Sequence, residues 1–337
     1  MAKVRFDGPR VYTIAEIGMT HDGSFGLAKQ LTAGAIESGA DIVKYQCHIA
    51  DAETLRSAPP PPYFSEESRF DYFSRTAFSA EQYAELVQFC HDRDVLACIS
   101  VFSLEAVDVV AASGADIIKI PSGEVSNIPM LRHAASTGLP VIMSSGMSDW
   151  ASVDRAVETF RDVESFCLVQ CSSIYPCPPE EVGLNLIQEM QERYSLPIGL
   201  SDHSLGGATA VAAVALGAKV IEKHFTLSKG LYGPDARFSL DLDEFKRMTE
   251  DIQFVAQACQ SKVSKDDLEK YAEMKRVFEK SIVIKGGVKK GDTLGIENLS
   301  FKKPGTGISA ECTDDVQGRV VNKTIEHDTM LQWEDMD

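Results

Sequence analysis

The sequence has no run of about 18 apolar residues, the length that a membrane-spanning helix needs, so we expect no transmembrane segment. Its first residues also lack the apolar stretch of a signal peptide, which favours a cytoplasmic protein. Positive charge is scarce as well, because 33 lysines and arginines face 50 acidic residues, a formal net charge of −17. A chain this acidic is a poor partner for nucleic acid or an anionic membrane surface, so it must hold any anionic substrate in a local basic pocket.

Cysteine pairs with the spacing of a structural zinc site are also missing, because none of the eight cysteines belongs to a CxxC pair. A disulfide framework is typical of short secreted chains, whereas this chain has 337 residues. We therefore expect buried thiols in a reducing compartment. The cysteines that fall within predicted strands and helices are Cys47, Cys90, Cys98, Cys167 and Cys171.

The sequence does contain a regular alternation of β-rich runs and amphipathic helical patterns. Strict alternation predicts a parallel sheet, and eight such units close most naturally into a (β/α)₈ TIM barrel. An open doubly wound sheet is the alternative, but no GxGxxG turn follows the first predicted strand. Glycines stand where helix C-terminal caps belong, at Gly39, Gly114, Gly138 and Gly217. The predicted strands span 11–18, 41–46, 96–101, 116–122, 140–146, 166–173, 197–204 and 219–225.

The alternation ends after the eighth strand, which predicts a second domain. Helical patterns at 242–259 and 265–278 are followed by short strands, glycines and turns. We predict a barrel domain at 1–261, a linker helix at 262–278 and a small β-rich domain at 279–337. Within the barrel, the stretch 49–79 is long for a connection. It follows the second strand and so emerges at the C-terminal face, where it forms either a lid or dimer-contact loop or a mobile linker.

Catalytic groups of a (β/α)₈ barrel lie at the C-terminal ends of its strands, so each predicted strand end tests for an active site. Every one of these ends carries polar side chains, although buried ionisable groups are costly unless they are paired. Lys44 and Gln46 are two residues apart, and so are Glu222 and His224, so each pair shares one face of its strand. The other polar strand-end residues are Glu16, Ser100, Lys119, Ser122, Glu124, Ser144, Ser173, Tyr175, Ser201 and Asp202.

Two histidines, His203 and His224, end the predicted seventh and eighth strands, each with a carboxylate nearby. Either one alone is explained by a hydrogen-bonded core histidine. Together they indicate a divalent metal site. Two imidazole nitrogens completed by water and substrate oxygens suit Mn²⁺, Mg²⁺ or Co²⁺, whereas a structural zinc site needs four protein ligands.

Lys44 and Lys119 have two interpretations. They either pair with Glu16 or Glu124, or they bind a phosphate and a carboxylate. The segment 144–146 is predicted to open a helix, which would add backbone N–H groups to such an anion site. Hydroxyl donors for the same anion are Ser100, Ser122 and Ser144.

These segments together resemble the sialic acid synthase family, whose members condense phosphoenolpyruvate with an N-acyl hexosamine to make nonulosonic acids. The C-terminal segments KKGD at 289–292 and KPGTGI at 303–308 resemble the antifreeze-like (SAF) domain of these synthases. The barrel segments that carry the resemblance are IAEIGMTHDG at 14–23, VKYQ at 43–46, IIKIPSGE at 117–124, SSGM at 144–147, CSSIYP at 171–176, GLSDHS at 199–204, EKHFT at 222–226 and GPD at 233–235.

The resemblance implies roles for individual residues. It implies that His203 and His224 hold a divalent metal, Mn²⁺ before Mg²⁺ or Co²⁺, and that the chain forms a domain-swapped homodimer. The implied catalytic groups are Glu16, which positions a metal-bound water, and Glu124 and Glu222, which transfer protons near the acceptor. The implied substrate-binding residues are Lys44, Gln46, Ser100, Lys119, Ser122, Ser144, Ser173, Tyr175, Ser201, Asp235 and Lys303.

The chain departs from the family pattern at three positions. Thr20 and Ser173 stand where the family usually has asparagine, and Lys303 stands where it has an arginine, so the planar fork of a guanidinium is missing there. All three lie nearer the expected sugar than the phosphate, so the acceptor stays open. The alternatives are a phosphoenolpyruvate aldol synthase that uses a 6-phosphorylated or other aldose, a metal hydrolase, and a non-catalytic saccharide-binding homologue.

Overall fold

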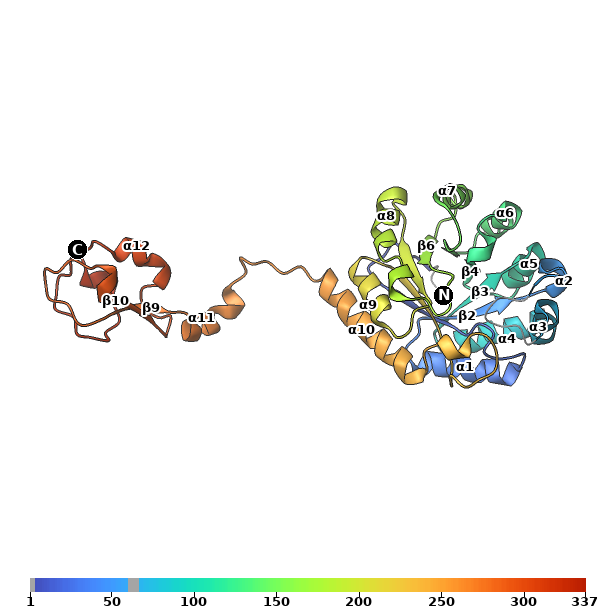
Figure 1. Ribbon diagram of the computed structural model, residues 1–337, viewed down its shortest axis with the longest axis horizontal. Helices are drawn as coiled ribbons and strands as arrows, with labels where there is room; N and C mark the ends of the chain where they lie inside the picture. The colour runs from blue at the N-terminus through green and yellow to red at the C-terminus, as the bar shows by residue number, and fades with distance from the viewer. Residues whose placement is uncertain (1–3, 60–66) are drawn as a thin grey trace. The chain divides into compact units, whose positions relative to one another are not determined.

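The computed structural model describes residues 4–59 and 67–337, which divide into two compact units, Met1–Ser261 and Lys262–Asp337. The first unit is a closed barrel of eight parallel strands in sequential order, surrounded by helices, and this confirms the predicted fold (Figure 1). The strands are β1 (Tyr12–Glu16), β2 (Ile42–Cys47), β3 (Leu96–Val101), β4 (Ile117–Ile120), β5 (Val141–Ser144), β6 (Phe166–Cys171), β7 (Ile198–Asp202) and β8 (Val220–His224).

The helices around the barrel start and stop at recognisable signals. Ser79 begins one helix and Asp241 another, and each forms a capping box with the residue three positions on. The four predicted cap glycines all have positive φ, from 70° to 96°, as a helix C-terminus requires. The helices are α1 (Phe25–Glu37), α4 (Ala80–His91), α5 (Leu104–Ala112), α6 (Ile128–Ser136), α7 (Trp150–Thr159), α8 (Asn185–Tyr194), α9 (Ala208–Ala215) and α10 (Leu242–Gln260).

Side chains two residues apart on a strand point to the same side. In this barrel the inward-pointing side chains form an apolar lower layer and, nearer the C-terminal ends of the strands, a polar upper layer. Ile14 precedes Glu16, Ile42 precedes Lys44, and each strand repeats the pattern up to its C-terminal end. Strand β7 has Gly199 in the lower layer, where an added Cβ would lie 2.4 Å from the carbonyl oxygen of Val220. The buried lower cluster consists of Val4, Phe6, Ile14, Ile42, Cys98, Ile117, Ile142, Cys167, Val169 and Val220.

The predicted irregular stretch 49–79 contains two short helices, α2 (Ala50–Glu53) and α3 (Arg69–Thr76), so the prediction of a loop was wrong for these residues. The side chain of Ser68 accepts a hydrogen bond from the Asp71 backbone N–H and so caps α3, while Phe70, Tyr72 and Thr76 bury one face. Residues 60–66 of the proline-rich part lie outside the described residues. The proposed lid or dimer role stays a prediction.

The second unit has its own small core. Strands β9 (Ser281–Ile284) and β10 (Leu299–Lys302) pair antiparallel, followed by the short helix α12 (Thr313–Val316). This confirms the predicted small β-rich domain after the barrel. The core residues are Ile282, Ile284, Val288, Leu294, Leu299, Ile308, Val316, Val321, Ile325, Leu331 and Met336.

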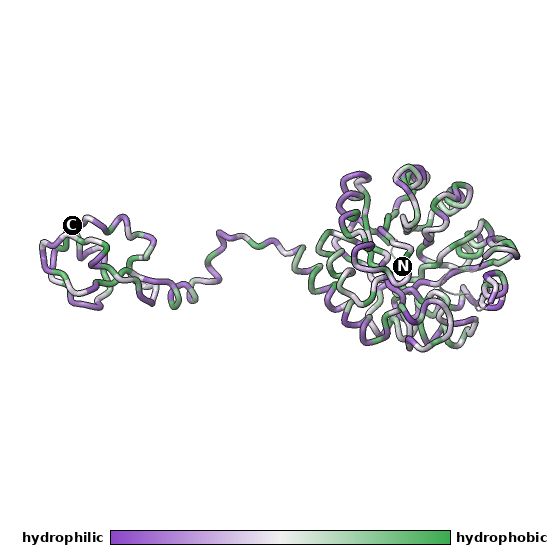
Figure 2. The backbone as a smooth tube through the Cα atoms, viewed as in Figure 1, coloured by the Kyte–Doolittle hydropathy of each residue, from purple (hydrophilic) through white to green (hydrophobic). Residues whose placement is uncertain are grey.

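The predicted helix 265–278 was too long. Only α11 (Ala272–Phe278) is α-helical, preceded by a single 3₁₀ turn, Glu269–Tyr271. Residues 262–271 are exposed and largely hydrophilic (Figure 2). Because short helices depend on burying an apolar face, this stretch lacks the packing that would extend the helix.

All eight cysteines are free, and the five that were predicted to be buried are buried. Within residues 4–59 and 67–337, no helix combines the length and the apolar composition required to cross a bilayer.

Candidate active site

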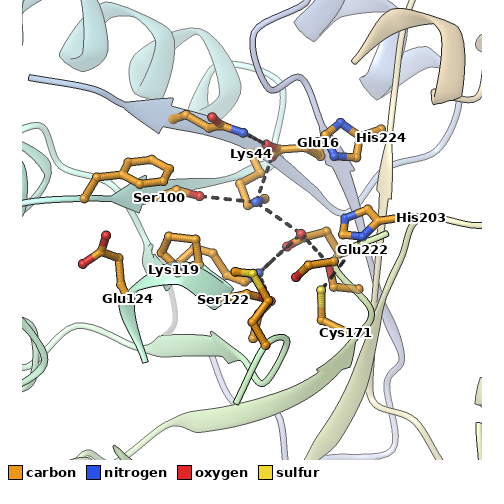
Figure 3. Close-up of a pocket in the computed structure, with 18 of the residues that line it drawn as sticks. Glu16, Lys44, Ser100, Lys119, Ser122, Glu124, Cys171, His203, Glu222 and His224 are labelled. Carbon is orange, nitrogen blue, oxygen red and sulfur yellow. Dashed lines mark hydrogen bonds and ion pairs between the residues drawn. The ribbon is translucent and has the colours of Figure 1, made fainter. Parts of the chain in front are cut away.

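A cavity of about 540 Å³ lies at the C-terminal end of the barrel strands and is lined by all but two of the predicted site residues (Figure 3). The two exceptions are Asp235, which lies in an adjoining cavity, and Lys303, which belongs to the second unit. The predicted residues that the fold brings together here are Glu16, Lys44, Gln46, Ser100, Lys119, Ser122, Glu124, Ser144, Ser173, Tyr175, Ser201, His203, Glu222 and His224.

The floor of the cavity is a buried network of two ammonium groups and two carboxylates. Lys44 Nζ lies 3.0 Å from a Glu16 carboxylate oxygen and 3.2 Å from Glu222 Oε1. Lys119 Nζ lies 3.1 Å from Glu222 Oε2 and donates a hydrogen bond to Ser144 Oγ at 2.6 Å. Glu222 therefore bridges both lysines from the opposite side of the barrel (Figure 3).

The lysine pairing is partly as predicted. Lys44 pairs with Glu16, but Lys119 pairs with Glu222, and Glu124 stands apart from it (Figure 3). The pairing of Lys119 with Glu124 was therefore wrong, because the closed barrel brings β8 opposite β4. Each ammonium group has three donors. Lys119 uses two of them on Glu222 and Ser144 and has one left for an anion, whereas Lys44 already faces Glu16, Glu222 and Ser100, so an anion at Lys44 must take the place of one partner.

The network keeps Lys44 and Glu222 ionised despite burial. Burial favours the neutral form of Lys44, but Glu16 and Glu222 outweigh it, and the pKa of Lys44 is raised. Burial would likewise raise the pKa of Glu222, but Lys119 and Lys44 outweigh it and lower this pKa well below its usual range. The floor of the cavity thus carries fixed charges of both signs, held by one another.

His203 and His224 approach each other with ring centroids 5.5 Å apart. The Ser172 carbonyl oxygen lies 2.7 Å from His203 Nδ1, which therefore donates to it, and Nε2 lies 3.0 Å from the Tyr175 hydroxyl. Burial would lower the pKa of His203, but Cys171 and the Ser172 carbonyl outweigh it and raise this pKa. Burial lowers the pKa of His224, and its Nδ1 is buried with no hydrogen-bond partner in the part of the chain that the structure describes. A metal would bind His203 at Nε2 of the neutral ring, in place of the Tyr175 contact.

These two imidazoles fit the metal site expected from the sequence. A histidine that donates one ring N–H to a backbone carbonyl and presents the other nitrogen is the usual arrangement of a metal ligand. Outside residues 1–3 and 60–66, no group of three or more His, Cys, Asp or Glu side chains is placed to hold a metal ion. Any cation held here would take its other ligands from water or substrate.

Asp202, the carboxylate next to His203 in sequence, points away from the cavity. Its carboxylate pairs with Lys223 at 2.8 Å, and both side chains are buried. Residues 202 and 223 alternate with the cavity-lining residues of their strands, so they face the surrounding helices. The carboxylate that stands next to His203 in the sequence is therefore engaged with Lys223, outside the cavity.

The predicted helix start at 144–146 was also wrong. Helix α7 begins at Trp150, and the side chain of Asp149 accepts a hydrogen bond from the Ser152 backbone N–H. The N-terminus of α7 is therefore satisfied by its own cap. Ser144 still reaches the cavity through its hydroxyl.

A smaller cavity of about 130 Å³ adjoins the first and contains Asp235. Asp235 accepts a hydrogen bond from the Met19 backbone N–H at 3.0 Å. The residues that line both cavities are Gln46, Arg69, Phe73, Tyr175 and His224.

Several cavity residues were missed at the sequence level. His48 continues the alternation of Lys44 and Gln46, and that pattern could have revealed it. Its Nε2 lies 2.9 Å from Oε1 of the Gln46 side chain, and its Nδ1 lies 2.8 Å from Glu53. The ring therefore orients the Gln46 side-chain amide, which donates to Glu16 at 2.6 Å. The other missed residues with reactive, charged or aromatic side chains are Arg69, Phe73, Phe102 and Cys171.

Arg69 and Phe73 had no such signal, because they lie on α3 within the long connection after β2. Cys171 ends β6 in the polar layer, with its sulfur 4.0 Å from His203 Nδ1. Burial alone would raise the pKa of this thiol, but His203 and nearby donors outweigh it and lower the pKa to about 7.

The arrangement suits a small anionic substrate next to a Lewis-acid site. Lys44, Lys119 and the surrounding hydroxyls offer donors to phosphate or carboxylate oxygens. The imidazole pair lies above them at the ends of β7 and β8. A second substrate placed beside the two histidines would meet the first substrate at its reactive end.

Comparison with known proteins agrees with this arrangement. The chain matches the NeuB family over residues 31–264 and the SAF domain over residues 279–336. It is 33% identical to the N,N'-diacetyllegionaminic acid synthase of Campylobacter jejuni serotype O:2 over 328 residues, 95% of this chain and 98% of that protein. It is 32% identical to the human N-acetylneuraminate-9-phosphate synthase over 97% of this chain and 92% of that protein.

Among solved structures, the chain resembles the N-acetylneuraminic acid synthetase of Leptospira borgpetersenii. The TM-score is 0.69 at 28% identity, and the match covers 79% of this chain and 91% of that one.

Proposed function

Because this chain belongs to the NeuB family of sialic acid synthases, we propose that it condenses phosphoenolpyruvate with an N-acyl hexosamine and water to give a nonulosonic acid and phosphate. Its relatives are nonulosonic and sialic acid synthases, which supports an enzyme that joins phosphoenolpyruvate to a sugar. The observation that carries the proposal is the buried Lys44–Glu222–Lys119 network at the base of a cavity rimmed by His203 and His224.

In the proposed reaction, Lys44 and Lys119 bind the carboxylate and phosphate of phosphoenolpyruvate, assisted by the hydroxyls of Ser100, Ser122 and Ser144. The methylene carbon of phosphoenolpyruvate attacks the aldehyde carbon of the open-chain sugar, whose oxygen becomes a hydroxyl by taking up a proton. Water adds to the cationic carbon that remains and loses a proton. The C–O bond to phosphate then breaks, which releases phosphate and leaves the keto group.

The charged groups of the cavity have defined tasks in this scheme. Glu16 orients the attacking water from its position next to Lys44. Burial raises the pKa of Glu124, which suits a carboxylic acid that gives a proton to the sugar oxygen. Glu222 is ionised between Lys44 and Lys119, and we propose it as the second proton-transfer group.

His203 and His224 would hold a divalent cation, with Mn²⁺ first and Mg²⁺ or Co²⁺ as alternatives, which when bound polarises the aldehyde oxygen. The two imidazoles and Tyr175 orient the acceptor beside them. Gln46, Ser173, Ser201 and Asp235 are the further acceptor contacts that we propose.

We also propose the domain roles and assembly expected from the sequence. Residues 1–261 form the synthase barrel, 262–278 the linker and 279–337 the SAF domain. In a domain-swapped homodimer, Lys303 of one chain would contact the acceptor bound to the other chain.

A 6-phosphorylated acceptor is the second candidate, because the human relative is named a 9-phosphate synthase. Phosphate release from phosphoenolpyruvate, assayed with neutral and 6-phosphorylated aldoses, with and without EDTA, tests both candidates. Release that needs an N-acyl hexosamine and stops with EDTA supports the first proposal. No release with any acceptor would refute it and would favour a saccharide-binding protein.

A further inference from the structure

Arg69, in the first turn of α3, differs from the other basic residues of the cavity wall. Lys44 and Lys119 are each ion-paired, whereas no carboxylate within residues 4–59 and 67–337 lies within ion-pair distance of Arg69. Its Nε is buried and has no hydrogen-bond partner in that part of the chain. A guanidinium cannot lose its proton, so a buried Nε–H without an acceptor is unfavourable unless a ligand supplies one.

The position of Arg69 indicates which substrate would do so. Arg69 lines both the main cavity and the smaller cavity that contains Asp235. Phosphoenolpyruvate is assigned to the lysines at the floor, so the substrate that reaches the wall shared by the two cavities is the acceptor sugar. This step rests on the proposed function.

An apolar surface lies next to the Arg69 donors. The guanidinium carbon is 5.3 Å from the centroid of the Phe73 ring. Phe73 stacks on His48 at 3.8 Å with an interplanar angle of 7°, and His48 stacks on Phe102 at 4.1 Å. The contacts of His48 with Gln46 and Glu53 hold its ring in place. A flat, rigid aromatic face beside an unpaired N–H suits a planar group that has an oxygen acceptor at its edge and an apolar end.

Two kinds of substituent have such an oxygen, a neutral acyl amide and an anionic group. The two kinds differ in how they would fit beside the Phe73 ring, which lies 5.3 Å from the Arg69 guanidinium carbon. The methyl group of an acyl amide would pack against Phe73, where a charged group would lose hydration.

We propose that Arg69 and Phe73 form the binding site for the acyl amide group of the acceptor sugar, so that Arg69 determines acceptor specificity. The Arg69 Nε–H donates to the amide carbonyl oxygen, and the plane of the amide packs against the Phe73 ring.

The test compares acceptors that differ only in this group, N-acetylmannosamine and mannose, with N-acetylmannosamine 6-phosphate as the anionic arm. Variants R69Q, R69K and F73L are assayed for phosphate release with each acceptor and with varied phosphoenolpyruvate. The control is R56Q, the same change at an exposed arginine of the same connection that lies outside the cavity.

We expect R69Q to raise the KM for N-acetylmannosamine about tenfold to a hundredfold, the effect of losing a hydrogen bond from a charged donor. The KM for phosphoenolpyruvate should stay within about twofold in both R69Q and R56Q, as for changes outside that site. R69K, which keeps the charge but lacks the planar fork, should recover only part of the loss. F73L should weaken N-acetylmannosamine more than mannose.

Three results would overturn the proposal. An unchanged acceptor KM in R69Q, with active wild-type enzyme, would refute the Arg69 site and leave the proposed function standing. A loss confined to the 6-phosphate acceptor would show that Arg69 binds an anion. No phosphate release by the wild-type enzyme with any acceptor would refute the proposed function and this inference with it.

Discussion

Replacing Glu222 with glutamine should destabilise the ligand-free protein and increase its stabilisation by phosphoenolpyruvate. The Glu222 carboxylate lies 3.1 Å from Lys119, 3.2 Å from Lys44 and 2.9 Å from the Ser201 hydroxyl, all within the buried floor. E222Q leaves both ammonium groups with Glu16 as the remaining carboxylate of the network. Removing one partner of a buried ion pair costs about 3–5 kcal/mol. For a domain of this size that corresponds to a Tm lower by roughly 6–20 °C.

Phosphoenolpyruvate brings negative charge to the same ammonium groups, so it should compensate for the missing carboxylate. We therefore expect its saturating addition to raise the Tm of E222Q by more than it raises the Tm of the wild-type protein. Phosphate release should nevertheless fall, because glutamine cannot accept a proton. Thermal melts followed by circular dichroism, with and without phosphoenolpyruvate, measure the first effect.

The control is E158Q, which removes the carboxylate of an exposed ion pair with Arg161. Such pairs contribute about 0–1 kcal/mol, so E158Q should melt close to the wild-type temperature. Suppose that E222Q and E158Q had the same Tm and that phosphoenolpyruvate raised both Tm values equally. The charge balance of the cavity floor would then not depend on Glu222, and the assignment of Lys44 and Lys119 to an anionic substrate would lose its basis.

Three further predictions follow from the same structure. H203A should bind less Mn²⁺, seen as metal content after dialysis, and should lose EDTA-sensitive phosphate release; full activity and full metal content would refute the ligand assignment. D202N should lower the free energy of unfolding in urea by about 3–5 kcal/mol, because it breaks the buried ion pair with Lys223. The KM for phosphoenolpyruvate should stay unchanged, and a selective rise in that KM would show that Asp202 takes part in substrate binding. The folded-state pKa of Glu222 is lowered, so its stabilising contribution is complete above the unfolded pKa of about 4.3 and is lost as the pH falls through the folded pKa. Below about pH 4 the stability of the wild-type protein should therefore decline more steeply than that of E222Q. Parallel stability profiles of the two proteins would contradict this.

The sequence was sufficient to predict the barrel and most of the site for one physical reason. In a parallel strand, alternate residues share a face, and the last inward position of each strand opens onto the same end of the barrel. Lys44, Gln46 and His224 could therefore be assigned to one cavity from their positions alone. His48 obeys the same rule and was missed only because the alternation was not followed one step further.

The sequence could not predict contacts between residues that come together only when the barrel closes. Lys119 pairs with Glu222 because β4 and β8 face each other across the barrel, and no local pattern encodes that distance. Arg69 and Phe73 reach the cavity only because α3 folds back over the barrel end, within a connection that was expected to be irregular. The polar segment 262–271 was expected to be part of a linker helix, but its residues are exposed and only the 3₁₀ turn at 269–271 forms.

The floor of the cavity is built on barrel strands, whereas Arg69 and Phe73 are carried by a helix in a connection between strands. Connections tolerate substitution, insertion and deletion far better than strands that share a closed sheet. If Arg69 and Phe73 bind the acceptor as proposed, mutational drift in this one segment can change which sugar is accepted while the lysines proposed to bind phosphoenolpyruvate stay fixed. A laboratory evolution experiment that aims at new acceptors should randomise α3 and leave the strand ends alone.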